Sequence, residues 1–380
     1  MKNVKPVKMQ WVTGIALAAA VLLAAGAAQA ADDWDLYMLR LVNRARQNPA
    51  GEAARIGSDV TDDRAPVPPL AYQPEVGQAA VNHNTWMIAN LGNIASGSAP
   101  DSFSHYETLN GLSSGAAATG TPSYTGAMLG SRITATGFSW SAAGENIATR
   151  WSTITIPVDQ ARIDAAHQGW WESAGHRNNM LSTSYTVFGH RAESMSFAPP
   201  LGGLPSPYDN VHFATQTFAR PAGSPTTYIF GVFFDDKDGS GNWTPRNLND
   251  ALHEGRGNVP FDVYVAGTVT RVSGGTTLAN GSFSVRVGNG LYDLEFDVAG
   301  GPVVIENVLV NGANRNAGDI TVAGVLGAED PELFMQCFAG PGKTPAPTGE
   351  TTAQACLGMY DHDGDSDVDL RDYAAFMRSY

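Results

Sequence analysis

The C-terminal region contains regularly spaced carboxylates that are typical of a calcium loop. Within residues 361–372, aspartates stand at loop positions 1, 3, 5, 7, 9 and 12. Calcium binds six to eight oxygens, and alternate positions of a tight loop can supply them. Position 7 usually contributes its backbone carbonyl, so the predicted side-chain ligands are Asp361, Asp363, Asp365, Asp369 and Asp372. The alternative interpretation is a solvated acidic turn.

A second, weaker calcium candidate follows an apolar segment in the middle of the chain. Asp236, Asp238, Ser240 and Asn242 place oxygens at positions 1, 3, 5 and 7, but position 12 is Asn247. The segment resembles the calcium loops of repeat β-sandwich modules in bacterial surface proteins. A tight surface turn after a strand explains the pattern equally well.

Three short segments place His and Glu in a region that is otherwise poor in charge. They are Phe103-Ser104-His105, Gly144-Glu145-Asn146-Ile147-Ala148 and Gly175-His176-Arg177-Asn178-Asn179. Imidazole nitrogen and carboxylate oxygen suit zinc and leave positions open for water or substrate. We therefore predict that His105, Glu145 and His176 converge in one site. The alternative role for Glu145 is structural, binding backbone N–H groups of its own loop.

These segments, with Leu41-Val42-Asn43-Arg44-Ala45-Arg46 before them and a strand ending at Phe218 after them, resemble the CAP superfamily. That superfamily contains cysteine-rich secretory proteins, antigen 5 and plant pathogenesis-related 1, and the similarity is to its bacterial, cysteine-poor branch. The resemblance implies a three-layer α-β-α sandwich with a central cleft. It also implies that His105 and Glu145 belong to a His/Glu cluster able to hold a divalent metal, often zinc, and His176 belongs to the bacterial motif.

Two positions depart from the family pattern. Ser173 stands where the animal and plant proteins have a second Glu, with Glu172 one residue earlier. Phe213 stands where they have a second His, with His212 adjacent. A complete four-residue metal site is therefore not expected.

The resemblance and these departures favour a non-enzymatic binding module. Its cleft would take a small hydrophobic, peptide or cell-wall ligand. The alternative is a metal-dependent hydrolase, with His105 and His176 as metal ligands and Glu145 as ligand or base.

The tail, residues 326–380, resembles a type I dockerin, the calcium-binding module that attaches secreted proteins to cohesin domains. The resemblance covers one intact half, because the upstream copy at residues 319–330 lacks acids at positions 3, 5 and 9. It implies calcium binding and makes a cohesin-like or cell-surface partner a candidate. A Pro-, Thr- and Gly-rich linker occupies residues 341–354, and Cys337 and Cys356 either pair or remain two thiols.

The first thirty residues form a predicted signal peptide. Three lysines precede an apolar run over residues 12–27, and Ala28-Gln29-Ala30 reads as a cleavage site. This predicts secretion, to the medium, the periplasm or the cell surface. No later segment is apolar for long enough to span a bilayer. The net charge of −14 and the absence of a basic patch argue against nucleic acid as a partner.

The helices and strands expected to position these residues indicate an α+β fold. In residues 32–222, apolar spacing predicts a helix from Leu36 to Ala45 that ends at Asn48-Pro49, one over residues 76–87 and one beginning near Pro157. A strand is expected around residues 215–218. Residues 111–126 read as a surface loop.

Residues 223–325 have the pattern of an all-β domain. The apolar run 228–234 predicts a buried strand, and alternation predicts further strands over residues 261–265 and 283–287. Asn-Gly turns at residues 280 and 289 separate them. This spacing is typical of a small β-sandwich. The tail adds a short helical, EF-hand-like segment.

Overall fold

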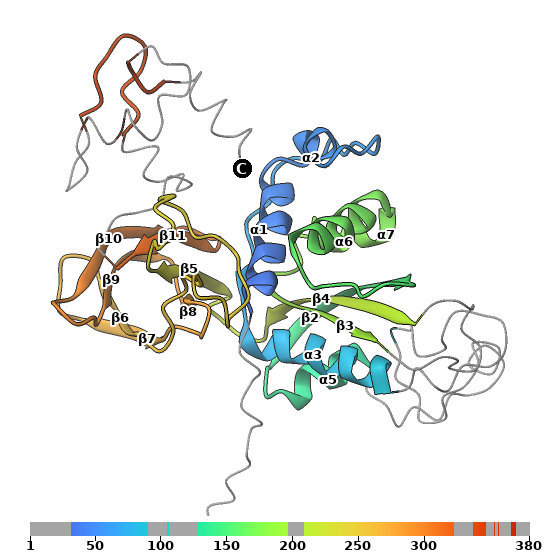
Figure 1. Ribbon diagram of the computed structural model, residues 1–380. Coiled ribbons are helices and arrows are strands. Elements are labelled where there is room, and N and C mark those ends of the chain that lie inside the picture. Colours follow the sequence, from blue (N-terminus) through green and yellow to red (C-terminus); the bar gives the residue numbers. More distant parts are fainter. Residues whose placement is uncertain are drawn as a thin grey trace, which may run out of the picture.

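The computed structural model describes residues 32–89, 105, 128–196, 209–322, 337–346, 353, 356 and 366–369. Its helices are α1 (Asp33–Gln47), α2 (Pro49–Ile56), α3 (Pro74–Ala89), α5 (Leu129–Ala135), α6 (Gln160–Glu172) and α7 (Ala174–Met180). Its first strands are β1 (Ala71–Tyr72), β2 (Trp140–Ser152), β3 (Val187–Ser196), β4 (Asn210–Pro221) and β5 (Thr227–Phe234). The later strands are β6 (Pro260–Val265), β7 (Arg271–Thr276), β8 (Ser282–Val287), β9 (Gly290–Phe296), β10 (Val303–Val310) and β11 (Arg315–Thr321). Figure 1 shows their arrangement.

The first helix is defined at both ends by side-chain caps. Asp32 accepts the backbone N–H of Asp35, and Asp35 accepts that of Asp32, both at 3.0 Å, which forms a capping box. The helix ends at Asn48, whose side chain caps α2 at Gly51 N. The predicted helix and its end are confirmed. The sequence pattern does not predict α2, because Asn48-Pro49 resembles a helix stop, whereas proline is also favoured at the first position of a helix, where Pro49 lies.

The first part of the chain is built on a four-stranded sheet in the order β1-β3-β4-β2. Strand β4 is buried along nearly its whole length, which confirms the strand predicted around residues 215–218. Helices α3 and α5 lie on one face of this sheet, and α1, α6 and α7 lie on the other (Figure 1). The third predicted helix begins at Gln160 rather than at Pro157, with Asp159 as its N-cap.

Strand β5 belongs to the cores of both parts of the described chain, since both of its faces are buried. Val232 and Phe234 pack into the core that contains α1 and α6. Ile229 and Phe233, on the opposite face, pack into a second core. A strand with apolar side chains on both faces was predicted, and its role as a shared wall follows from the tertiary structure.

The second part contains two sheets that share one core. Their strand orders are β10-β9-β6-β7 and β11-β5-β8. Phe233 of one sheet and Phe296 of the other stack with their ring centroids 4.7 Å apart. The strands predicted over residues 261–265 and 283–287 are confirmed as β6 and β8.

Polar contacts also hold the second part to α1. Arg40 forms an ion pair with Asp319 of β11, and its guanidinium lies 4.4 Å from the ring centroid of Trp243. Asp33, at the start of α1, lies 3.1 Å from Nε2 of His253. The position that began the upstream copy of the predicted tail loop, Asp319, is therefore part of a strand and of this interface.

In the tail, Cys337 and Cys356 form a disulfide, with their Cα atoms 5.3 Å apart. The backbone N–H of Ala339 donates to the carbonyl of Val368 at 3.0 Å, so the segment after Cys337 contacts the predicted calcium loop. Of the five predicted tail ligands, Asp369 is described and buried. The predictions that lie outside the described residues are the signal peptide, the loop at 111–126 and the ligands Asp361, Asp363, Asp365 and Asp372. No helix in the described part of the chain is long and apolar enough to cross a membrane.

Candidate functional site

The structure brings His105 and Glu145 together. Glu145 lies on β2, its side chain is 3% exposed, and its Oε1 is 3.0 Å from Nδ1 of His105. Its other oxygen, Oε2, accepts a hydrogen bond from Arg132 of α5, which is equally buried. Arg132 also donates to the backbone carbonyl of His105 at 3.3 Å. Both carboxylate oxygens of Glu145 are thus bound to side chains of the protein.

Burial alone raises the pKa of Glu145, but the hydrogen bond from His105 and the nearby His83 and Arg132 lower it below its ordinary value. Glu145 is therefore ionised at neutral pH. An ionised carboxylate accepts hydrogen bonds and cannot donate them, so Nδ1 of His105 carries the proton. When the imidazole is neutral, its lone pair is then on Nε2.

The Gly-Glu-Asn and Gly-His-Arg-x-Asn motifs meet through hydrogen bonds. Asn146 is completely buried, and its Nδ2 donates to the backbone carbonyl of His176 (3.1 Å) and to Gln216 (2.8 Å). Asn179 of α7 donates to the backbone carbonyl of Glu145 (3.1 Å) and to Oδ1 of Asn146 (2.9 Å). The two asparagines therefore hold α7 against β2 and fix the place of Glu145.

His176 lies on α7 and is half-buried. Burial lowers its pKa, and the nearby His105 lowers it further. Within the described part of the chain, its Nδ1 has no hydrogen-bond partner. His176 is thus a neutral imidazole near His105 at neutral pH.

Two residues of this cluster were missed at the sequence level. His83 of α3 is completely buried, and its Nε2 lies 3.9 Å from Oε1 of Glu145. It falls on the apolar face predicted for this helix, between Val76 and Met87, and that exception to the pattern was an available signal. Arg132 gave no such signal, because α5 was not predicted.

The departures from the family pattern have a structural explanation. Phe213 is completely buried and packs with Met87 of α3 and Val211. His212, the preceding residue on β4, points to the other face because side chains alternate along a strand, and its Nδ1 lies 2.8 Å from Oγ of Ser194. Neither residue adds an imidazole to the cluster around Glu145, and Glu172 is exposed.

The donor set does not fit a zinc site as arranged. In the described part of the chain, a single group brings three His, Cys, Asp or Glu ligand atoms within 4.8 Å of one another, and it does not include His105, Glu145 or His176. The guanidinium of Arg132 also takes one oxygen of Glu145 and neutralises its charge. A cation would have to displace these contacts.

A cavity of about 320 Å³ lies beside the cluster. His105 and Glu145 line it together with Met128, Leu129 and Gly130 at the start of α5. Met128 is half-exposed, and the His105 side chain is 45% exposed. The cavity therefore offers an accessible apolar wall and one imidazole that can exchange a hydrogen bond.

The group that does bring three ligand atoms together is the weaker calcium candidate. Asp236 and Asp238 meet Glu254, which lies outside the sequence pattern of that loop. Glu254 is completely buried and accepts backbone N–H groups of Lys237, Asp238 and Thr244. These hydrogen bonds fix the loop backbone around the Glu254 carboxylate.

The other predicted oxygens of this loop are arranged differently. The hydroxyl of Ser240 donates to the backbone carbonyl of Asn242 at 2.8 Å. Oδ1 of Asp236 and Oδ1 of Asn242 are buried atoms with no hydrogen-bond partner among the described residues. Two oxygens of the loop are thus left for another donor or a cation.

Two comparisons with known proteins found similarities. Residues 39–194 match the model of CAP, the Cysteine-rich secretory protein family, and this segment is a CAP domain. A solved structure, an extracellular protein containing a SCP domain from Bacillus anthracis str. Ames, is similar at 24% sequence identity and a TM-score of 0.28. The similarity covers 49% of this chain and 40% of that one. No curated protein matches the chain.

Proposed function

We propose that the CAP domain is a non-enzymatic binding module of a secreted protein. It takes a small lipid, peptide or cell-wall ligand in the cavity beside His105. The observation that carries this proposal is that both oxygens of Glu145 are bound, one to His105 and one to Arg132. Glu145 then acts as a positioning residue, which fixes the tautomer of His105.

This arrangement suits a ligand with an apolar part and a hydrogen-bond donor. The apolar part packs on Met128 and Leu129. A hydroxyl or amide N–H of the ligand donates to Nε2 of His105. The alternative function, a metal-dependent hydrolase using His105, Glu145 and His176, requires Arg132 to release Glu145.

Metal analysis and ligand binding together test the proposal. Purified protein equilibrated with zinc is analysed for metal, and a fluorescent fatty acid and a labelled muramyl peptide are titrated into it. We expect no stoichiometric zinc, and binding of one of these probes that His105→Ala weakens. Ser141→Ala, on the same strand as Glu145, is the control. One zinc per chain that His105→Ala removes would overturn the proposal in favour of the hydrolase.

Calcium binding is a second proposed function. The tail loop supplies Asp361, Asp363, Asp365, Asp369 and Asp372, which crowd negative charge in one short segment when no cation is bound. Calcium binding would order the tail, and the ordered tail would attach the protein to a cohesin-like or cell-surface partner. Calorimetry on the mature chain is expected to show calcium binding that Asp361→Ala reduces by one site.

The loop at Asp236, Asp238 and Glu254 is a separate calcium candidate. The oxygens of Asp236 and Asn242 that have no hydrogen-bond partner among the described residues support it. In the same calorimetry, Glu254→Gln is expected to remove a site that Asp361→Ala leaves in place. If both variants bind as the parent does, the calcium proposal is wrong for both loops.

Secretion is proposed from the predicted signal peptide, residues 1–30. The disulfide Cys337–Cys356 supports it, because disulfides persist in oxidising compartments. Sequencing the N-terminus of protein recovered outside the cytoplasm is expected to begin at Ala31.

A further inference from the structure

One edge of the CAP-domain sheet has a partner strand over only its first two residues in the described part of the chain. Strand β3 pairs with β4 over its whole length, from Val187 to Ser196. On its other side, β1 covers Val187 and Phe188 alone. From Gly189 to Ser196, no strand in the described part of the chain pairs with this side of β3.

The backbone groups of this edge point outward at alternate residues. The carbonyl of Phe188 accepts the backbone N–H of Gln73 at 2.9 Å, so it points toward the β1 side. Carbonyls alternate along a strand, and those of Ala192 and Ser194 therefore point to the same side. An unpaired edge of this kind is a template for another strand.

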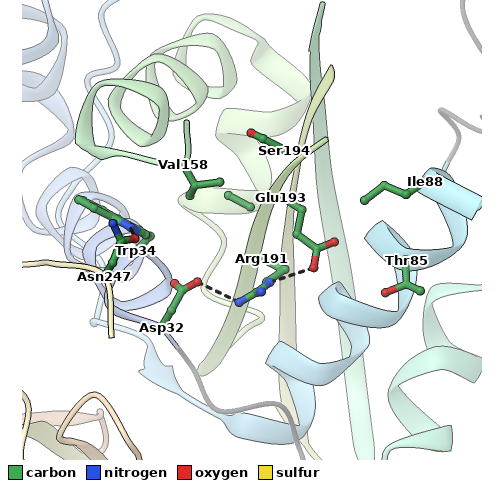
Figure 2. A pocket seen from close by; sticks show the side chains of 10 residues that line it. Asp32, Trp34, Thr85, Ile88, Val158, Arg191, Glu193, Ser194 and Asn247 are labelled. Atoms are coloured by element: carbon green, nitrogen blue, oxygen red, sulfur yellow. Dashed lines mark hydrogen bonds and ion pairs between the residues drawn. The ribbon is translucent and has the colours of Figure 1, made fainter. Parts of the chain in front are cut away.

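A cavity of about 470 Å³ follows the open edge, at residues 191–194. Trp34 and Val158 form its wall on one side of the strand, and Thr85 and Ile88 of α3 form the wall on the other (Figure 2). The hollow thus lies between the two helical layers, over the edge itself. Its lining combines an exposed backbone with apolar side chains, as in sites that receive an extended peptide.

The cavity contains more acidic than basic side chains. Arg191 lies between Asp32 (2.9 Å) and Glu193 (3.3 Å), as Figure 2 shows. Asp35, behind it, lies 4.0 Å from the same guanidinium. Two acidic side chains therefore line the cavity beside one cation, and the buried Asp35 lies close to that cation. The side chains of Asp32 and Glu193 remain 20% and 22% exposed, so a ligand can reach them.

The ionisation of these carboxylates is consistent with that imbalance. Burial, with the charge of Asp35 added, raises the pKa of Asp32 to about 7. Burial also raises the pKa of Glu193. A cationic group placed beside them would stabilise their charged forms.

We propose that the open edge of β3 binds an extended peptide that carries a Lys or Arg side chain. The peptide backbone pairs with Ala192 and Ser194, and its cation lies beside Asp32 and Glu193. This site is distinct from the cavity at His105, because Glu145 lies on β2, at the opposite edge of the sheet. The inference does not rest on the proposed ligand of that cavity.

The test uses the mature full-length chain and three fluorescein-labelled pentapeptides. The first alternates Val and Lys, the second alternates Val and Glu, and the third repeats the first with its backbone N-methylated at alternate residues. We expect saturable anisotropy for the first. The Glu peptide should bind at least about tenfold more weakly because it repels the acidic lining. N-methylation should have a similar effect, because it removes the strand hydrogen bonds.

Variants then locate the site. Glu193→Gln keeps the size of the side chain and is expected to weaken the Lys peptide about fivefold, as for a partly exposed charge pair. Glu306→Gln, an exposed acid on β10, should leave the affinity unchanged. Absence of saturable binding, equal binding of the N-methylated peptide, or an equal loss with Glu306→Gln would overturn the proposal. Absence of saturable binding is also the result expected if another segment of this chain occupies the edge of β3.

Discussion

Replacing Arg132 by Met tests whether the buried ion pair organises the candidate site. The side chains of Arg132 and Glu145 are 2% and 3% exposed, so the substitution leaves a carboxylate inside the protein without its guanidinium partner. Breaking a buried pair from one side typically costs about 3 kcal/mol or more. We expect the free energy of unfolding to fall by about that amount.

The matched control is Arg64→Met. Arg64 is 39% exposed, and its partner Asp62 keeps a second guanidinium, that of Arg177 at 2.9 Å. Its removal should cost less than about 1 kcal/mol. Urea unfolding followed by tryptophan fluorescence measures both variants, and an unchanged slope with urea shows that the transitions are comparable.

A double variant separates the ion pair from simple loss of packing. Arg132→Met with Glu145→Gln removes the uncompensated charge, and much of the lost stability should return. Nitrogen chemical shifts of the His105 ring should at the same time lose the preference for a proton on Nδ1. If Arg132→Met costs no more than Arg64→Met, or if the double variant is as unstable as the single one, the positioning role of Glu145 is wrong.

Two further predictions concern stability. Burial raises the pKa of Glu52, but His167 and Arg44 more than offset this and lower it from 4.5 to about 2, so its ionised form stabilises the fold by about 3 kcal/mol. Because the pKa of Glu52 is lower in the folded protein than in the unfolded chain, this stability is present above pH 4.5 and is lost as the pH falls toward about 2. Glu52→Gln should therefore flatten the curve of unfolding free energy against pH in that window. An unchanged curve would contradict this prediction. Gly189→Ala should cost about 2 kcal/mol or more in urea unfolding, since an added Cβ would lie 2.1 Å from the backbone nitrogen of Gly77. Gly169→Ala, at an exposed position of α6, has open space and should be neutral or stabilising by about 0.5 kcal/mol. Equal effects of the two substitutions would argue against the close approach of β3 and α3.

Some local elements were predictable because their signals lie within a few residues. Helix α1 follows from its apolar spacing and from Asn48-Pro49, and β5 from a continuous apolar run. The order of the Gly-Glu-Asn and Gly-His-Arg motifs carried the resemblance to the CAP family, and the family match covers residues 39–194. Each of these features depends on side chains that are close to one another in the sequence.

The sequence by itself thus determined those helices and strands that have strong local signals, the family resemblance and the residues able to do chemistry. Only the tertiary structure decided what those residues contact. Arg132 reaches Glu145 from a helix that periodicity did not indicate, and Glu254 joins Asp236 from the far end of its loop. The open edge of β3 depends on how short β1 is, which no local pattern encodes. The physical reason is that partners of a side chain are set by the packing of distant elements, whereas periodicity and caps report on neighbours along the chain.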